Sequence, residues 1–376
     1  MKISDFDYRL PPDLIAQHPA EARDRSRLLV LYRRDGRLED RLFADLPFYL
    51  REGELLVMND TKVIPARLHG RSEGEAVEIL LVRELEQDRW EALFKSLRKA
   101  RSGRRLVFAP GSFEALIEGR LPNGRVLLRF LYEGDFRTLL DRYGVMPLPP
   151  YIRPETRDLR PETRDQRYST PDALSLQSPV SSFQSLTGER YQTVYAKEEG
   201  AIAAPTAGLH FTWSLLEQLK AKGVETAFLT LHVGVGTFRP IRVEEVEQHW
   251  MEPERYRIPE ETAQAIKAAK AEERRVFAVG TTTVRALEDA APMLDARTSN
   301  IQHPTSNVEG WADLFIYPGY RFKVVDALIT NFHLPRSTPL LLVSAFATRE
   351  QILGAYHHAI ERWYRFYSYG DAMLIL

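Results

Sequence analysis

The sequence predicts an α/β fold, with a layered α/β main domain and an inserted antiparallel β-barrel-like domain. Short β-type runs follow one another from about Glu54 to Leu131, whereas strand and helix patterns alternate after Tyr191. The chain has 376 residues, more than one hydrophobic core usually organises, so we expect two domains.

The predicted barrel region consists of apolar runs rich in β-branched and aromatic residues, separated by glycines and charged turns. These runs are 54–59, 77–82, 90–94, 105–108, 114–118 and 125–131. Asn123 and Gly124 lie between the last two runs and favour the positive φ of a tight two-residue turn. We therefore expect a hairpin there, within a barrel or sandwich.

Strands and helices are expected to alternate in the second half of the chain. The pattern predicts strands at 224–231, 275–280 and 323–330, and helices at 260–274, 282–290, 340–347 and 349–363. Such alternation is typical of an α/β layer domain. The run 27–32 is expected to join the same sheet, which would make the barrel region an insertion.

The predicted domain boundaries follow from these patterns. Residues 1–65 and 189–376 would form the α/β catalytic domain, and 66–152 the inserted barrel-like domain. Residues 153–188 contain RPETRD twice and a tail rich in Ser, Pro and Gln, with little to bury. We expect this segment to be a flexible insertion.

Composition excludes several classes of function. The chain has no cysteine, so disulfides, thiolate nucleophiles and cysteine metal sites are excluded. No apolar run reaches the roughly 18 residues that span a bilayer, and the first residues do not resemble a signal peptide. We expect a cytoplasmic protein without membrane contact.

One run of the chain is strongly basic, although the formal net charge is only −1. A nucleic acid would therefore have to be bound by local patches. The run 95–105 offers six cations within eleven residues as phosphate contacts, unless it is a solvated loop: Lys95, Arg98, Lys99, Arg101, Arg104 and Arg105.

Glycines and hydroxyls follow two of the predicted strands, where open α/β sheets bind their ligands. Gly234 and Gly236 permit close approach of a ligand, but Arg239 replaces the third glycine of a dinucleotide fingerprint, so that interpretation is rejected. Thr281 and Thr282 begin a predicted helix that contains Arg285. This arrangement could bind a carboxylate or phosphate, although threonine is also an ordinary N-cap.

Three histidines lie near predicted turns or strand ends, where imidazole could transfer protons: His210, His232 and His333. Each could equally be a buried histidine bonded to the backbone. Together with Asp326 they could bind zinc, but no H-E-x-x-H or H-x-H spacing places two ligands on one element. We therefore predict no metal.

Polar residues also follow the apolar run 54–59, and aromatic residues cluster near the C-terminus. Asp60, Lys62 and Arg67 could bind a ligand or satisfy a turn. Tyr369 belongs to the segment YRFYSYGDAM, whose rings could stack on a base or fill a core.

Several long segments together resemble one known family, the S-adenosylmethionine:tRNA ribosyltransferase-isomerases of queuosine biosynthesis. They are NDTKVIPARL, YQTVYA, AAPTAGLHFT, TLHVGVGTFRP, AVGTTTVRALE, YPGYRFKVVDALITNFHLPRSTPLLLVSAF and YRFYSYGDAM, in this order along the chain. The segment 153–188 departs from the short link that the family has there.

The resemblance implies an α/β domain with an inserted barrel-like domain, S-adenosylmethionine as a consumed ribosyl donor, and no metal. The acceptor would be 7-aminomethyl-7-deazaguanine at the wobble position of tRNA with a GUN anticodon. The products would be epoxyqueuosine in tRNA, adenine and methionine. The protein is expected to act as a monomer.

Side-chain chemistry suggests how the motif residues divide this work. His210 or His333 would act as acid or base, with His232 and Asp326 as neighbours. Asn331 lies beside His333 in the motif DALITNFHLP and is expected to bind substrate with Asp60, Lys62, Arg67, Gly234, Gly236, Thr281, Thr282, Arg285 and Tyr369. The alternatives are an S-adenosylmethionine-dependent RNA methyltransferase, a tRNA-binding protein without catalysis, and a metal hydrolase.

Overall fold

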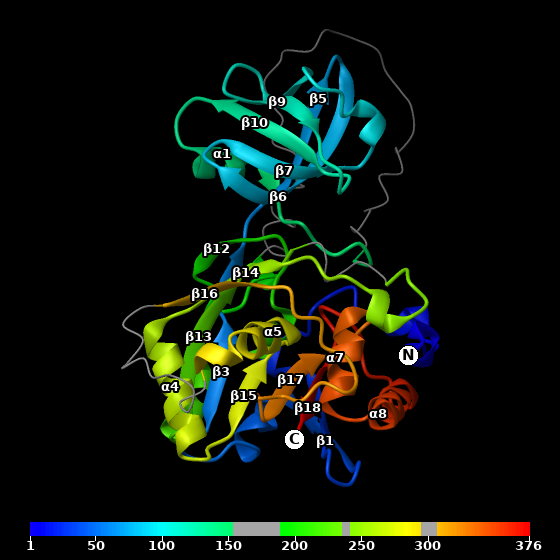
Figure 1. Cartoon of the computed structure of the whole chain (residues 1–376), viewed down its shortest axis with the longest axis vertical. Helices are drawn as coiled ribbons and strands as arrows, with labels where there is room; N and C mark the ends of the chain where they lie inside the picture. Colours follow the sequence, from blue (N-terminus) through cyan, green and yellow to red (C-terminus); the bar gives the residue numbers. More distant parts are fainter. Residues whose placement is uncertain (153–188, 235–240, 295–306) are drawn as a thin grey trace, which may run out of the picture.

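A nine-stranded mixed sheet forms the centre of the larger part of the molecule (Figure 1). The computed structural model describes residues 1–152, 189–234, 241–294 and 307–376. The strands are, in spatial order, β16 (Val308–Ala312), β14 (Glu254–Ile258), β13 (Glu225–Leu231), β3 (Leu55–Asn59), β15 (Val276–Val279), β17 (Ala327–Asn331), β18 (Ala372–Ile375), β1 (Arg27–Leu31) and β2 (Leu38–Leu42).

Four neighbouring strands at the middle of this sheet run parallel: β13, β3, β15 and β17. Leu55 at the start of β3 lies opposite Glu225 on one side and Val276 on the other. The carboxyl ends of all four strands therefore meet at one edge of the sheet. β18 then pairs antiparallel with β17 and parallel with β1.

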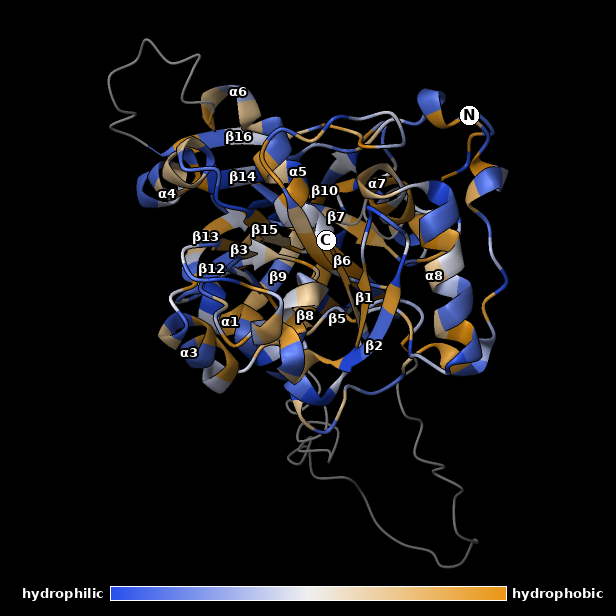
Figure 2. Cartoon of the chain, turned by 90° about the horizontal axis from the view of Figure 1, so that it is seen from below, coloured by the Kyte–Doolittle hydropathy of each residue, from blue (hydrophilic) through white to orange (hydrophobic). Residues whose placement is uncertain are grey.

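Helices and loops cover both faces of the sheet. Its strands carry apolar residues at consecutive positions, which point to opposite faces, so both faces must be buried. On β3, Leu55 and Val57 face one core, and Leu56 and Met58 face the other. Figure 2 shows hydrophobic colour along the central strands and mixed faces on the outer helices. The helices of this part are α3 (Trp213–Ala221), α4 (Glu260–Ala271), α5 (Thr281–Asp289), α6 (Ala291–Leu294), α7 (Thr338–Phe346) and α8 (Arg349–Glu361).

A second sheet closes into a six-stranded antiparallel barrel, which stands at the other end of the long axis (Figure 1). Its strands are, in order, β5 (Arg67–Ser72), β6 (Glu75–Glu86), β7 (Arg89–Phe94), β10 (Val126–Tyr132), β9 (Phe113–Arg120) and β8 (Arg105–Ala109). Pairing of Arg71 with Val107 closes the barrel between β5 and β8. The short strand β11 (Gly144–Val145) extends β5, and α1 (Phe136–Tyr143) contributes Phe136 to the barrel core.

The predicted fold class is confirmed, and each predicted strand and helix overlaps an observed one, but the run 54–59, expected in the barrel region, is β3 of the main sheet. The run 27–32 joins the main sheet as β1, beside the C-terminal β18. The expected hairpin joins β9 and β10, with Gly124 at φ 80°. Its connection is longer than two residues, because Arg120 pairs with Val126.

Two short parallel strands, β4 (Thr61–Val63) and β12 (Glu198–Ala201), lie between the main sheet and the barrel (Figure 1). The polar residues after β3 therefore continue into a small sheet of their own. In the described ranges, no helix is long and apolar enough to cross a membrane. The predicted flexible segment 153–188 lies outside the described residues.

Candidate active site

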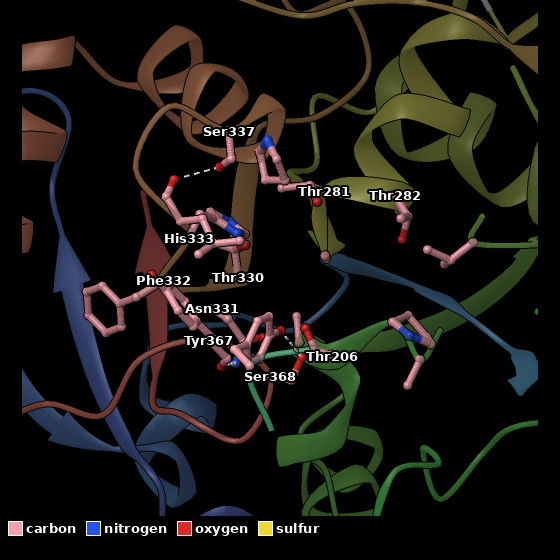
Figure 3. Close-up of a pocket in the computed structure, with 18 residues that line it drawn as sticks. Thr206, Thr281, Thr282, Thr330, Asn331, Phe332, His333, Ser337, Tyr367 and Ser368 are labelled. Carbon is pink, nitrogen blue, oxygen red and sulfur yellow. Dashed lines mark hydrogen bonds between the residues drawn. The ribbon is translucent and has the colours of Figure 1, made fainter. Parts of the chain in front are cut away.

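A cavity lies at the edge where the parallel strands end (Figure 3). It encloses about 650 Å³, including space open to solvent. Its polar lining comes from the ends of β15 and β17, the 3-10 turn Thr206–His210 and the segment before β18, with Tyr151 and the α7 N-cap Ser337 in addition. The polar residues that line it are Tyr151, Thr206, Thr281, Thr282, Thr330, Asn331, His333, Ser337, Tyr367 and Ser368.

Asn331 ends β17 and presents an unpartnered carbonyl oxygen at this cavity. Its side chain is 3% exposed, and its Nδ2 donates to the carbonyl of Tyr367 at 3.1 Å. Nδ2 also lies 3.1 Å from Nε2 of His210. Among the described residues, no group hydrogen-bonds to Asn331 Oδ1. A buried acceptor without a partner is costly, so the site favours a ligand that donates to this oxygen.

His210 is buried behind Asn331 and does not line the main cavity. Its Nδ1 lies 2.7 Å from Oγ of Ser26, whose hydroxyl donates to the carbonyl of Arg23 at 3.1 Å. Ser26 Oγ therefore accepts from His210 Nδ1–H, and Nε2 is left to accept from Asn331. Burial, with the positive charges of Arg365 and Arg23, lowers the pKa of His210 to about 3, so the ring is neutral.

His333 is the histidine that lines the cavity (Figure 3). Its Nε2 lies 2.8 Å from Oγ1 of Thr330, and its backbone is fixed at both ends. The N–H donates to the hydroxyl of Tyr356 at 2.9 Å, and the carbonyl accepts from Tyr8. Burial lowers the pKa of His333 to about 3, so this imidazole is also neutral at physiological pH.

The amino end of α5 opens into the cavity through Thr281 and Thr282. Gly280 adopts φ 89° as the N-cap, a conformation that residues with a Cβ rarely adopt. The first N–H groups of a helix lack partners within it and carry partial positive charge. An anionic group of a ligand is therefore favoured beside these threonines.

Arg285, one turn further along α5, is committed to the protein itself. It forms a buried ion pair with Glu254 and donates to the carbonyls of Ala312 and Leu314. Glu254 also accepts from the backbone N–H of Gly234 at 2.8 Å. Gly234 and Arg285, both expected to contact ligand, thus share one carboxylate that the sequence reasoning missed. Gly236 lies outside the described residues.

Asp60 and His232 follow the neighbouring strands β3 and β13, but neither lines the cavity. Asp60 accepts from Oγ1 of Thr230 at 2.7 Å, and burial raises the pKa of its carboxyl group. His232 lies 2.9 Å from Oγ1 of Thr61, and burial lowers its pKa. These groups support the chain where it leaves the sheet toward the barrel.

Three other expected residues lie away from the cavity. Asp326 precedes β17, at the opposite edge of the sheet, where it pairs with Lys270 at 3.0 Å and accepts from the N–H of Val276. Lys62 pairs with Glu199 on the surface. Arg67 pairs with Glu78 inside the barrel sheet. The structure does not bring these three to the histidine and threonine groups.

The basic run is largely paired with carboxylates of the barrel. Lys95, Lys99, Arg104 and Arg105 form ion pairs with Glu78, Glu75, Glu73 and Glu114, respectively. Arg98 and Arg101 are exposed and form no ion pair with a described carboxylate. The run therefore offers two uncommitted cations rather than six.

Tyr369 lies beside the main cavity, in a smaller pocket with Ser368 and His210. Its ring contacts the ring of Tyr191 edge-on at a centroid distance of 5.9 Å. Sequence reasoning missed the polar groups around it, among them Tyr151, whose hydroxyl lies 2.6 Å from Oγ of Ser368. Ser368 lies in the aromatic segment YRFYSYGDAM, but nothing in the sequence distinguished this serine from the four aromatic residues around it.

No group of three or more histidine, aspartate or glutamate side chains in the described part of the chain could hold a metal ion. The zinc alternative needs His210, His232, His333 and Asp326 together. His210 bonds to Ser26 and Asn331, His232 to Thr61, and Asp326 to Lys270. These residues do not form a common ligand set.

Comparison with known proteins places this chain in one family. The chain belongs to the queuosine biosynthesis protein family, whose model matches residues 3–375. Curated relatives named S-adenosylmethionine:tRNA ribosyltransferase-isomerase are 50% identical over the whole of both chains in Moorella thermoacetica and in Symbiobacterium thermophilum. A crystal structure of an S-adenosylmethionine tRNA ribosyltransferase from Thermotoga maritima is 38% identical, covers 99% of this chain and all of its own, and has a TM-score of 0.52. The family predicted from the sequence motifs is confirmed.

Proposed function

We propose that this protein transfers and isomerises the ribosyl part of S-adenosylmethionine onto 7-aminomethyl-7-deazaguanine at the wobble position of tRNA, in queuosine biosynthesis. The products are epoxyqueuosine in tRNA, adenine and methionine. Full-length identity of 50% to ribosyltransferase-isomerases carries this proposal. The polar cavity supports it, since four parallel strands end beside it.

The donor binds with its anionic end at the start of α5. Thr281 and Thr282 offer hydroxyl groups and backbone N–H groups to the methionine carboxylate. Arg285 contributes indirectly, because its charge is already balanced by Glu254. The adenosyl part then extends toward the end of β17.

His333 moves the proton that starts the reaction. The sulfonium acidifies the adjoining C5′ protons, so a neutral imidazole within reach can remove one. Burial opposes a new charge on His333, but here the proton transfer only moves a positive charge that the sulfonium has already brought into the cavity. The protonated ring can then donate to the departing adenine.

Asn331 holds the substrate, and His210 is a positioning residue that holds Asn331. Both Nδ2 hydrogens of the amide are used, one by Tyr367 and one by His210, which leaves Oδ1 as the group offered to substrate. A ribosyl hydroxyl or a base amino group is a suitable donor. The neutral state of His210 is required, because an imidazolium would repel the amide donor.

Other sequence predictions extend this proposal. The domain boundaries at 65/66 and 152/153, the GUN anticodon, a monomeric state and a cytoplasmic location stay predictions. So does RNA contact by the basic run, where Arg98 and Arg101 are the residues that the ion pairs leave uncommitted.

Product analysis tests the proposed function. The protein is incubated with S-adenosylmethionine and tRNA that carries the 7-aminomethyl precursor, and the digested nucleosides are analysed by mass. We expect epoxyqueuosine and one adenine per modified tRNA. Formation of S-adenosylhomocysteine and a methylated nucleoside would instead establish the methyltransferase alternative, and tRNA binding without donor consumption the non-catalytic one.

A further inference from the structure

Two arginines without acidic partners lie together in the smaller pocket beside the main cavity. Arg23 belongs to the N-terminal segment and Arg190 to the chain that follows residue 188, and both line this pocket. Burial lowers the pKa of Arg23, and the positive charge of Arg190 lowers it further. Arg23 also donates to the carbonyl of Glu189, the residue before Arg190, so the two side chains lie at one place in the fold.

Backbone carbonyls hold both guanidinium groups in place without neutralising them. Arg23 donates to the carbonyls of Leu209 and Glu189, and Arg190 to those of Ala20 and Glu21. Nε of Arg190 is buried and has no partner among the described residues. This N–H is an unsatisfied donor in a pocket that already has two positive charges.

Two carboxylates near the pocket, those of Asp24 and Asp371, are engaged by other groups. Asp24 accepts from the hydroxyl of Thr212 at 3.3 Å. Asp371 pairs with Arg365 and accepts two backbone N–H groups. The remaining described lining residues of the pocket are uncharged: Pro19, Ala20, Leu209, His210, Ser368, Tyr369 and Gly370.

We propose that Arg23 and Arg190 form an oxyanion site that binds a backbone phosphate of the tRNA substrate. The inference rests on the proposed function for the identity of the RNA. Guanidinium groups held in a fixed orientation suit phosphate oxygens, which accept paired hydrogen bonds. Ser368 lines both pockets, so a phosphate here would fix the RNA beside the cavity that receives its base.

The other source of an oxyanion is the carboxylate of the donor. The amino end of α5, on the main cavity, already offers a place for that carboxylate. The arginine pocket is half-exposed at Pro19, Ala20 and both arginines, as a contact to a large polyanion requires. These observations favour the RNA.

Binding of tRNA to Arg190→Gln tests the proposal without turnover. The dissociation constant for the GUN tRNA is measured by fluorescence anisotropy at several salt concentrations. We expect binding about tenfold weaker and a slope of log K against log salt that is smaller by about 1, since one phosphate contact is lost. Arg190→Lys should keep most of the slope. Arg37→Gln is the matched control, because this exposed arginine pairs with Glu39.

A second variant leaves the carbonyl contacts of both arginines intact. Ala20→Glu introduces a carboxylate at the edge of the pocket, where it can neutralise the pair and compete with the ligand. We expect unchanged or higher thermal stability and weaker tRNA binding. This variant keeps the test valid if Arg190→Gln fails to fold.

Unchanged affinity and salt slope in folded Arg190→Gln and Ala20→Glu would overturn the site. A higher KM for S-adenosylmethionine with unchanged tRNA affinity would overturn the RNA assignment and make the oxyanion the donor carboxylate. A wild-type protein that binds tRNA through this pocket but releases no adenine would contradict the proposed function alone.

Discussion

The two ends of β17 differ in what their polar residues contact. At its start, Asp326 pairs with Lys270 and fixes the N–H of Val276, so its carboxylate joins α4 and β15. At its end, Asn331 and His333 face a cavity, and Asn331 retains an acceptor without a protein partner. The segment around β17 thus carries a structural carboxylate and, five and seven residues later, two groups that face the cavity.

This difference teaches that direction along a parallel strand, rather than membership of a motif, separates structural from functional polar residues. Open α/β sheets bind ligands outside the carboxyl ends of their strands, where loops rather than neighbouring strands meet the side chains. Variants at the carboxyl end of β17 should therefore mainly lower activity, and variants at its start should mainly lower stability.

The largest expected effect is that of His333→Ala. If His333 moves the proton, kcat for adenine release should fall by roughly 100-fold or more, the usual contribution of a positioned acid or base. Steady-state kinetics with saturating tRNA measure this, with Asp326→Asn as the control from the other end of the strand. Near-wild-type kcat in the His333 variant would remove it from the proposed chemistry.

Replacement of Asn331 by Leu should lower kcat/KM by roughly 10- to 100-fold, the range expected for one buried hydrogen bond to substrate. His210→Leu frees the Asn331 amide to rotate and should have part of this effect. His210→Gln places an acceptor near Nδ2 of Asn331 and should restore much of the activity. If Leu and Gln at position 210 lower kcat/KM equally while both proteins stay folded, the positioning role is wrong.

Asp326→Ala should produce the reverse pattern. Loss of its contacts to Lys270 and Val276 should lower the free energy of unfolding by about 1–2 kcal/mol, because a half-buried backbone N–H loses its partner. Chemical denaturation measures this. Both kcat and KM should stay within about twofold of the wild type, and a large loss of kcat would contradict the division between the two ends.

Acid should destabilise the carboxyl-end site gradually. The pKa of His210 lies near 3 in the folded protein and near 6.5 when unfolded, so below pH 6.5 the unfolded chain binds the proton more readily. The neutral, buried His210 therefore contributes to the free energy of unfolding fully above pH 6.5. This contribution is lost as the pH falls toward 3, by at most about 1.4 kcal/mol per pH unit. Urea denaturation between pH 6.5 and 5 measures how the free energy of unfolding depends on pH, and this dependence should be shallower in His210→Gln than in the wild type. Equal pH dependence in the two proteins would contradict the burial of a neutral imidazole.

The main sheet could be predicted from sequence because its central strands are apolar runs that end in segments rich in polar residues and glycine. Strand β14 and the edge strand β16 were not predicted, because charged residues such as Arg255 and Glu309 interrupt their apolar pattern. Strand ends identified Thr281, Thr282, Asn331 and His333 as residues that would meet. Sequence could not reveal that Arg285 is paired with Glu254, because 31 residues separate the two.

The arginine pocket escaped sequence reasoning for a related reason. Arg23 and Arg190 are 167 positions apart, and each lies among acidic neighbours in sequence that suggest an ordinary surface ion pair. Only the fold brings the two arginines together, while Asp24 and Asp371 contact Thr212 and Arg365 instead. Charge density along the chain instead identified the barrel run, where most cations are paired.

A crystal structure with S-adenosylmethionine bound tests the central claim most directly. The donor should lie in the cavity at the carboxyl ends of β15 and β17, with its carboxylate at Thr281 and Thr282 and a donor group within hydrogen-bond distance of Asn331 Oδ1. A donor bound at the opposite edge of the sheet, near Asp326, or on the barrel would contradict the account.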